Sequence, residues 1–294
     1  MKQDKRFDGK DGSFHYIDWG GSGPLAHFSH ATGLSAHSYT PLISMINREL
    51  QVIGMDDRGH GKTTVPADTR KLQNWDPFVD DLDRFLSSFK EPIIAIGHSR
   101  GAVVSMLLAL RKPELIRALI LIDPTILPFS TMWLVYIAKK TRLNRYIPIA
   151  ARAARRNGTW PDRKTILAAY QNKGMFKSWQ KGFLEAYLKD GVQDKNDGKV
   201  CLSCDPAWEA RCFSVYPHDL WRYIPLVQQP VLALYGEMSD SFLPSAVRRF
   251  QSKLPHAQIS CFQNTSHFVP MEKPIETALA IRSFIAELSL NKIV

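Results

Sequence analysis

The sequence predicts an α/β protein with a mostly parallel central sheet, flanking helices and one inserted helical cap. Short β-branched runs alternate with longer helical patterns through the first 124 residues and again after Gln229. This alternation is typical of strand–helix–strand units that build a parallel sheet. Between Asp123 and Gln229 it stops for roughly 105 residues, although a crossover needs only about a dozen. We therefore expect an α/β core of residues 1–124 and 229–294, with residues 125–228 inserted as a helical cap.

Each predicted strand is an apolar, largely β-branched run bounded by glycine, proline or polar residues. The strands cover residues 14–19, 25–29, 51–56, 92–97, 118–122, 231–235 and 258–262. Helical spacing of apolar residues predicts helices near 39–47, 75–89, 100–111, 244–253 and 274–288, and within the cap at 164–170 and 176–188. Five of the seven tryptophans lie in the cap, which suggests an apolar pocket beneath it: Trp133, Trp160, Trp179, Trp208 and Trp221.

The composition is that of a soluble globular protein, with 45% hydrophobic and 22% charged residues in a chain of 294. The first ten residues are polar and charged and lack the apolar stretch of a secretory signal. The most apolar stretch, Pro128 to Ala138, is about half as long as a bilayer span. We therefore expect a cytoplasmic protein.

Neither a cofactor nor a metal ion is expected. The four cysteines (Cys201, Cys204, Cys212 and Cys261) are too few for a disulfide scaffold and are expected to be reduced. Cys201 and Cys204 form a single CxxC without the further ligands of a zinc site. Residues 59–63 (Gly-His-Gly-Lys-Thr) resemble part of a phosphate-binding loop, but Asp56 stands where the loop needs a glycine, which excludes nucleotide binding there.

The net charge of +10 has a local origin. One stretch of the cap holds nine basic residues and a single acid, Asp162: Lys139, Lys140, Arg142, Arg145, Arg152, Arg155, Arg156, Arg163 and Lys164. Such a surface could contact an anionic membrane, although a solvated helix surface is the commoner explanation. The chain contains none of the usual nucleic-acid-binding motifs, so nucleic acid is not an expected partner.

Ser99 is the predicted nucleophile. It lies in Gly97-His98-Ser99-Arg100-Gly101, a G-x-S-x-G motif between the apolar run 92–96 and the helical pattern 102–110. In this motif a sharp turn between strand and helix exposes the serine hydroxyl at the carboxyl edge of the sheet, and the glycines allow the close approach of strand and helix. A plain helix start capped by the serine is the alternative.

A serine hydroxyl needs a histidine as base and a carboxylate to orient that histidine. His267 is the predicted base, because it follows the last predicted strand and because this type of turn occurs with the chain order serine, acid, histidine. Asp240, after the strand 231–235, is the preferred acid. Asp123, at the end of the preceding strand, and Glu237 remain alternatives.

Two backbone N–H groups are predicted to form the oxyanion hole, as acyl transfer requires. Arg100, the residue after the nucleophile, supplies the first. Thr32 supplies the second, from the segment His30-Ala31-Thr32-Gly33-Leu34 that follows the strand 25–29. The Arg100 side chain either faces the pocket or pairs with a carboxylate.

The order of four motifs resembles that of the α/β-hydrolase superfamily along the whole chain: residues 30–33 (His-Ala-Thr-Gly), 57–61 (Asp-Arg-Gly-His-Gly), 97–101 (Gly-His-Ser-Arg-Gly) and 266–270 (Ser-His-Phe-Val-Pro). The chain looks most like the small capped members, which include carboxylesterases, lipases, carbon–carbon bond hydrolases and perhydrolases. Members that are dehalogenases or epoxide hydrolases carry an aspartate at the place of Ser99 and are disfavoured. Ala31 and the spacing of Gly236 and Asp240 depart from the commonest family pattern.

The resemblance implies a serine hydrolase that cleaves carboxylic esters through an acyl-enzyme on Ser99. Its expected partner is a small-molecule ester with an apolar acyl group. Two alternatives remain: a carbon–carbon bond hydrolase of dienone acids, in which Arg100 or a basic cap residue holds the substrate carboxylate, and a small-molecule receptor that uses the hydrolase fold.

Overall fold

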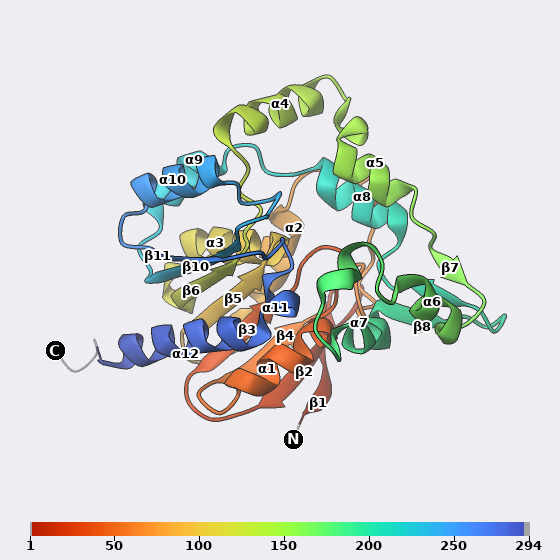
Figure 1. Cartoon of the computed structure of the whole chain (residues 1–294), viewed down its shortest axis with the longest axis horizontal. Coiled ribbons are helices and arrows are strands. Elements are labelled where there is room, and N and C mark those ends of the chain that lie inside the picture. Colours follow the sequence, from red (N-terminus) through yellow and green to blue (C-terminus); the bar gives the residue numbers. More distant parts are fainter. Residues whose placement is uncertain (1, 291–294) are drawn as a thin grey trace.

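The computed structural model describes residues 2–290. Its central sheet contains eight strands in the order β1-β2-β4-β3-β5-β6-β10-β11 (Figure 1). These strands are β1 (Gln3–Gly9), β2 (Gly12–Gly20), β3 (Leu25–Ser29), β4 (Gln51–Met55), β5 (Ile93–His98), β6 (Ile116–Ile122), β10 (Val231–Gly236) and β11 (Gln258–Phe262). All strands from β3 onward in this sheet run parallel, and β2 alone in the sheet runs in the opposite direction, antiparallel to both of its neighbours, β1 and β4. The predicted mostly parallel sheet is confirmed.

Helices cover both faces of the sheet. α1 (Thr40–Ile46) and α12 (Pro274–Leu290) pack on one face, and α2 (Asp76–Leu86), α3 (Arg100–Arg111) and α10 (Pro244–Lys253) on the other. In β5, Ile94 and Ile96 join the core on the α1 side, whereas Ile93 and Ala95 join the core on the α3 side. Burial on both faces explains why the parallel strands are continuous apolar runs in the sequence. Within residues 2–290, no helix is both long and apolar enough to span a bilayer.

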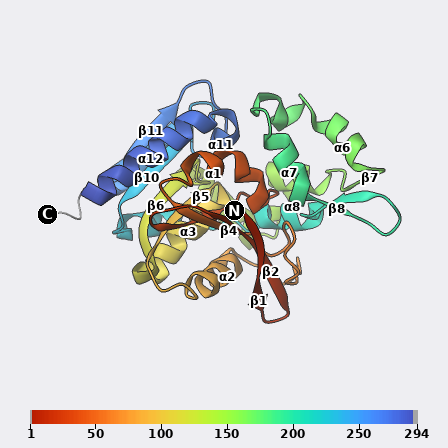
Figure 2. The ribbon, with the colours of Figure 1, turned by 90° about the horizontal axis from the view of Figure 1, so that it is seen from below.

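The β1 strand differs from the sequence prediction, which has no strand before residue 14. β1 pairs with β2 alone and its residues are all exposed or half-buried. Because β1 lies at the edge of the sheet and buries no apolar face, it carries no alternating apolar pattern. The β1–β2 hairpin projects from the rest of the sheet (Figure 2). The seven predicted strands correspond to β2 to β6, β10 and β11.

The chain between β6 and β10 contains the inserted segment. Its elements are α4 (Phe129–Lys140), α5 (Pro148–Ala154), β7 (Thr159–Trp160), α6 (Arg163–Tyr170), α7 (Phe183–Gly191), β8 (Val192–Asp194), β9 (Val200–Leu202), α8 (Pro206–Ser214) and α9 (Leu220–Tyr223), with short 3₁₀ turns between some of them. The segment contains mainly helices, together with a small antiparallel sheet of order β7-β9-β8. Strands of two or three residues are too short to show an alternating pattern.

The inserted segment is attached to the core at several points. α7 packs against α1 and the 3₁₀ turn η1 (Ala36–Tyr39) (Figure 2). The indole N–H of Trp208 donates to the carbonyl of Arg58 (3.1 Å). The guanidinium of Arg249, on α10 of the core, lies 5.3 Å from the centroid of the Trp221 ring. These two tryptophans therefore anchor the segment, whereas Trp133 is exposed to solvent.

The CxxC motif is part of the packing. All four cysteines are unbridged. Cys204 is fully buried, and this burial raises the pKa of its thiol well above the ordinary value. A thiol that stays protonated is a poor nucleophile and a poor metal ligand. Cys204 therefore behaves as a small apolar core residue.

Candidate active site

Ser99 lies at the turn that joins β5 to α3. Its φ of 58° and ψ of −119° are unusual for a residue with a side chain. A Cβ atom on Gly97 would lie 2.5 Å from the backbone of Gly101 and Ala102, and one on Gly101 would lie 2.2 Å from the carbonyl oxygen of Ser29. Strand and helix can therefore meet this closely only because both positions are glycine. The result is the strained turn that the motif predicts.

His267 and Asp123 form a hydrogen-bonded pair beside this turn. His267 Nδ1 donates to Asp123 Oδ1 over 3.0 Å, and the Asp123 side chain is fully buried. Asp123 also accepts hydrogen bonds from the hydroxyl of Ser239 (2.5 Å) and the backbone N–H of Gly236 (2.9 Å). Three donors thus hold the carboxylate in place. Burial alone would lower the pKa of His267, but the hydrogen bond and the charge of Asp123 outweigh it, so that this pKa is raised.

The preference for Asp240 as the partner of His267 is wrong in this structure. Asp240 is exposed, and its carboxylate accepts a hydrogen bond from the neighbouring Ser241. Glu237 is also exposed and accepts from the backbone N–H of Asn264. β6 and β10 are neighbouring parallel strands, so an acid at the end of either one lies at the same edge of the sheet. The chain order serine, acid, histidine fits both positions and does not distinguish them.

Thr125 is a site residue that the sequence does not reveal. Ser99 Oγ lies 3.0 Å from Thr125 Oγ1, and the carbonyl of Thr125 accepts from the hydroxyl of Tyr216 at 2.7 Å. Within residues 2–290, Ser99 Oγ forms a hydrogen bond with Thr125 and does not form one with His267. A rotation of the serine side chain must therefore precede transfer of its proton to the histidine. Such loose geometry is common in sites without a ligand.

The two predicted oxyanion donors are linked by the Arg100 side chain. Arg100 is 1% exposed, and its Nε donates to Thr32 Oγ1 at 2.9 Å. Its Nη1 lies 2.8 Å from Asp57 Oδ2 and forms an ion pair with it, although the angles do not meet those of a hydrogen bond. The guanidinium also stacks on Phe78, 4.1 Å from the centroid of the ring. Of the two possibilities left open by the sequence, pairing with a carboxylate is the observed one.

The backbone of the Thr32 loop is held by buried neutral side chains. The N–H of Gly33 donates to His60 Nε2 (3.1 Å), and the N–H of Ala31 donates to the hydroxyl of Tyr39 (3.0 Å). Burial lowers the pKa of His60 well below its ordinary value, so the ring is neutral and its Nε2 can accept. The N–H of Thr32 makes no hydrogen bond within the described chain, and that of Arg100, first in α3, has no intrahelical acceptor. Both donors are free to bind an oxyanion.

A buried ion pair of the inserted segment lies on this loop. Arg156 Nη1 donates to both carboxylate oxygens of Glu209, at 2.8 and 2.7 Å. Its Nη2 reaches the hydroxyls of Tyr170 and Tyr187. A Cβ atom on Gly33 would lie 2.5 Å from Glu209 Oε1. The segment therefore covers the predicted oxyanion loop with a neutralised pair of charges.

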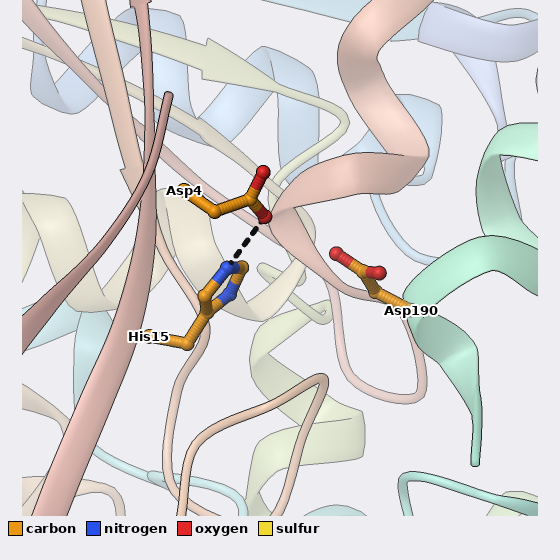
Figure 3. Close-up of side chains that lie close together, drawn as sticks. All are labelled: Asp4, His15 and Asp190. Carbon is orange, nitrogen blue, oxygen red and sulfur yellow. Dashed lines mark hydrogen bonds and ion pairs between the residues drawn. The ribbon is translucent and has the colours of Figure 1, made fainter. Parts of the chain in front are cut away.

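A second cluster of charged groups joins the β1–β2 hairpin to the inserted segment (Figure 3). His15 Nε2 donates to Asp4 (2.9 Å) and His15 Nδ1 to Asp56 (2.7 Å). Asp190, on α7, completes a set whose ligand atoms lie within 4.8 Å, as a metal site would require. However, Lys62 Nζ lies 2.8 Å from Asp190 and 3.5 Å from Asp4, so its ammonium already forms ion pairs with both carboxylates. We interpret the set as an ion-pair network.

This network predicts a pH-dependent contribution to stability. Burial lowers the pKa of His15, but the hydrogen bonds and charges of the carboxylates around it outweigh this effect and raise it. Because the pKa is raised in the folded protein, the stabilisation is complete below the pKa of about 6.5 that a histidine has in the unfolded chain. The stabilisation is lost as pH rises through the pKa that His15 has in the folded protein. In urea unfolding, we expect His15→Gln to destabilise the protein by about 1–3 kcal/mol at pH 6 and by less at pH 9. The exposed His256→Gln is the matched control, and an effect of His15→Gln that is independent of pH would contradict the interpretation.

Comparisons with known proteins agree with this fold. A family model described as "Alpha/beta hydrolase family" matches residues 28–280. The chain is 25% identical over 265 residues to the 2-(acetamidomethylene)succinate hydrolase of Mesorhizobium japonicum, which covers 90% of this chain and 89% of that protein. It is also 25% identical over 278 residues to an sn-1-specific diacylglycerol lipase of Mus musculus, covering 93% and 85%.

Solved structures show the same architecture. The crystal structure of E-2-(acetamidomethylene)succinate hydrolase superimposes with a TM-score of 0.76 at 22% identity, covering 97% of this chain and 100% of that one. A thioesterase domain from the curacin biosynthetic pathway superimposes with a TM-score of 0.74 at 18% identity, covering 98% and 99%. At these identities the likeness concerns the fold.

Proposed function

We propose that this chain, which belongs to the alpha/beta hydrolase family, hydrolyses carboxylic esters through an acyl-enzyme on Ser99. The observation that carries the proposal is the position of Ser99 in a strained turn, beside a histidine that a buried carboxylate orients. A small-molecule ester with an apolar acyl group is the proposed substrate. The similarity to a diacylglycerol lipase supports this substrate class.

In the first half of the reaction, Ser99 Oγ turns away from Thr125, and His267 Nε2 takes its proton as Oγ attacks the ester carbonyl. Asp123 accepts from Nδ1, which leaves Nε2 as the basic nitrogen and stabilises the imidazolium that forms. The N–H groups of Thr32 and Arg100 bind the oxygen that becomes negative. The imidazolium then protonates the departing alcohol, and the acyl group remains on Ser99.

In the second half, His267 takes a proton from water, whose oxygen attacks the acyl carbonyl of the intermediate. Collapse of the second tetrahedral state breaks the bond to Ser99 Oγ, and the imidazolium returns the proton to the serine. The products are one carboxylic acid and one alcohol for each ester and water consumed.

The proposal is tested with p-nitrophenyl esters of increasing acyl length and with a fluorophosphonate that modifies reactive serines. We expect turnover on at least one ester and a modification that maps to the peptide containing Ser99. Modification of Ser99 with turnover slower than about one per minute on every ester would instead favour a ligand receptor, since enzymes commonly turn over about ten times per second.

The carbon–carbon bond hydrolase alternative cannot use Arg100 or Arg156 to hold the carboxylate of the substrate, because both are paired, which leaves the unpaired basic residues of the cap for this role. It requires a free arginine or lysine to hold the carboxylate of the substrate. Arg100 pairs with Asp57, and Arg156 pairs with Glu209. A dienone acid included among the substrates tests this alternative directly: turnover of that acid without ester turnover would replace the ester proposal.

Arg100 is proposed as a positioning residue for the oxyanion hole. Its hydrogen bond to Thr32 Oγ1 connects the two donors, and a small misplacement of such groups is costly. For Arg100→Met we expect kcat to fall about 10²-fold with KM nearly unchanged, because the lost interaction acts in the transition state.

Thr32→Val serves as the matched variant, because it removes the acceptor and leaves the guanidinium in place. If Arg100 acts through Thr32, the double variant loses little more than either single variant, and Arg100→Lys recovers part of kcat. Fully additive losses, or an increase in KM alone, would show that Arg100 acts in another way.

A further inference from the structure

Exposed apolar side chains gather on α4 and on the loop that leads to α5. Seven of the fourteen large apolar side chains that are exposed in the described chain lie within residues 129–149. They are Phe129, Trp133, Leu134, Ile137, Leu143, Tyr146 and Ile149, with exposed fractions between 38% and 66%. A surface helix normally turns a polar face to solvent. Here the inner face of α4 buries Met132 and Val135, and the outer face is apolar as well.

Unpaired basic side chains border this apolar surface. No acidic residue occurs between Asp123 and Asp162. Five basic residues of this stretch are exposed and take part in none of the ion pairs found within residues 2–290: Lys140, Arg142, Arg145, Arg152 and Arg155. Arg156 differs, because it pairs with Glu209. The surface is thus both apolar and positively charged, and its charge is not compensated locally.

The position of α4 favours docking on an extended surface. α4 lies on the opposite side of the molecule from the N-terminus and outside the layers formed by the sheet and its helices (Figure 1). The five residues between Asp123 and Phe129 lead directly from the site to α4, and Thr125 among them contacts the Ser99 hydroxyl. A surface bound to α4 would therefore be connected to the Ser99 site through these five residues.

We propose that residues 129–155, the α4–α5 face, dock this protein on an anionic phospholipid bilayer. The apolar side chains enter the boundary between headgroups and acyl chains, and the basic side chains contact the anionic headgroups, as in interfacial helices. A second copy of this chain fits the charge less well, because a symmetric contact would place two basic surfaces against each other. Docking itself does not require that the proposed ester hydrolysis be correct.

Flotation with vesicles of phosphatidylcholine, with and without phosphatidylserine, tests the proposal on the whole chain. We expect the protein to float with the vesicles that contain phosphatidylserine, and binding to weaken as salt increases. The triple variant Trp133→Ser, Leu134→Ser, Ile137→Ser is expected to lose flotation. Replacing Lys140, Arg142 and Arg145 with glutamine is expected to weaken binding about 10²-fold on phosphatidylserine vesicles.

Matched controls come from exposed residues elsewhere in the fold. Ile275→Ser with Leu279→Ser removes two exposed apolar side chains of α12, and Arg248→Gln with Lys253→Gln removes two exposed charges of α10. Both controls should float as the parent protein does. Circular dichroism and thermal melting verify that each variant is folded.

Three results would overturn the proposal: no flotation with either vesicle, equal flotation with and without phosphatidylserine, or loss of flotation in the controls to the same extent as in the α4 variants. If the face instead joins two copies, light scattering would show a dimer that the triple serine variant converts to a monomer, with no flotation of the parent protein. Because binding is measured without any substrate, its failure leaves the test of ester hydrolysis unaffected.

Discussion

Replacing Ser99 with alanine is expected to lower kcat for p-nitrophenyl esters by about 10⁵- to 10⁶-fold, the loss seen when a serine hydrolase is deprived of its nucleophile. Without Oγ no acyl-enzyme forms, and only the N–H groups of Thr32 and Arg100 remain to assist attack by water. KM should change little, because within residues 2–290 the Ser99 hydroxyl makes a single side-chain hydrogen bond, to Thr125, and its loss affects the chemical step. The measurement is steady-state hydrolysis by the purified variant, with fluorophosphonate labelling in parallel.

Ser245→Ala, on the exposed surface of α10, is the control for this variant. It should retain the activity and the labelling of the parent protein. Thermal melting should give similar midpoints for all three proteins, since the Ser99 hydroxyl contributes one hydrogen bond to stability. Ester hydrolysis that survives in folded Ser99→Ala would refute the assignment of the nucleophile.

The nucleophile turn could be predicted because each of its requirements is local. The turn needs two glycines, a preceding strand and a following helix, and all of these lie within residues 92–111. The structure adds the physical reason: at Gly97 and Gly101 even a methyl group would collide with the backbone. Because these requirements involve neighbouring residues, they produce a sequence motif from which the turn can be predicted.

The partners of the site could not be predicted in the same way, because they depend on tertiary contacts. Asp123 and Asp240 both follow strands that end at the same edge of the sheet, and only the packing places Asp123 against His267. Thr125 lies in the loop after β6, and its hydroxyl contacts that of Ser99, but no sequence motif marks this loop. The Arg100 side chain forms an ion pair with Asp57, which lies 43 positions earlier in the chain. No sequence motif indicates that these two residues are partners.

Asp123→Asn is expected to lower kcat by about 10⁴-fold, whereas Asp240→Asn should leave it within about twofold. The buried carboxylate of Asp123 fixes the His267 tautomer with Nε2 free and stabilises the imidazolium, and an amide can do neither. Asp240 is exposed and bonded to Ser241, so its replacement removes only a distant charge. The two substitutions are chemically identical, and each variant is the control of the other in the same ester assay.

The pH profile of kcat/KM separates an electrostatic role of Asp123 from a loss of structure. Activity falls when His267 is protonated, and the hydrogen bond and charge of Asp123 raise the pKa of this histidine. In Asp123→Asn the acid limb of the profile should therefore move to lower pH, while a merely disordered site would lose activity at every pH alike. The amide can still accept from Gly236, which helps to keep the loop after β10 in place. A loss of about 10⁴-fold in Asp240→Asn, with Asp123→Asn nearly unaffected, would instead mean that this loop rearranges on substrate binding and that Asp240 becomes the partner of His267.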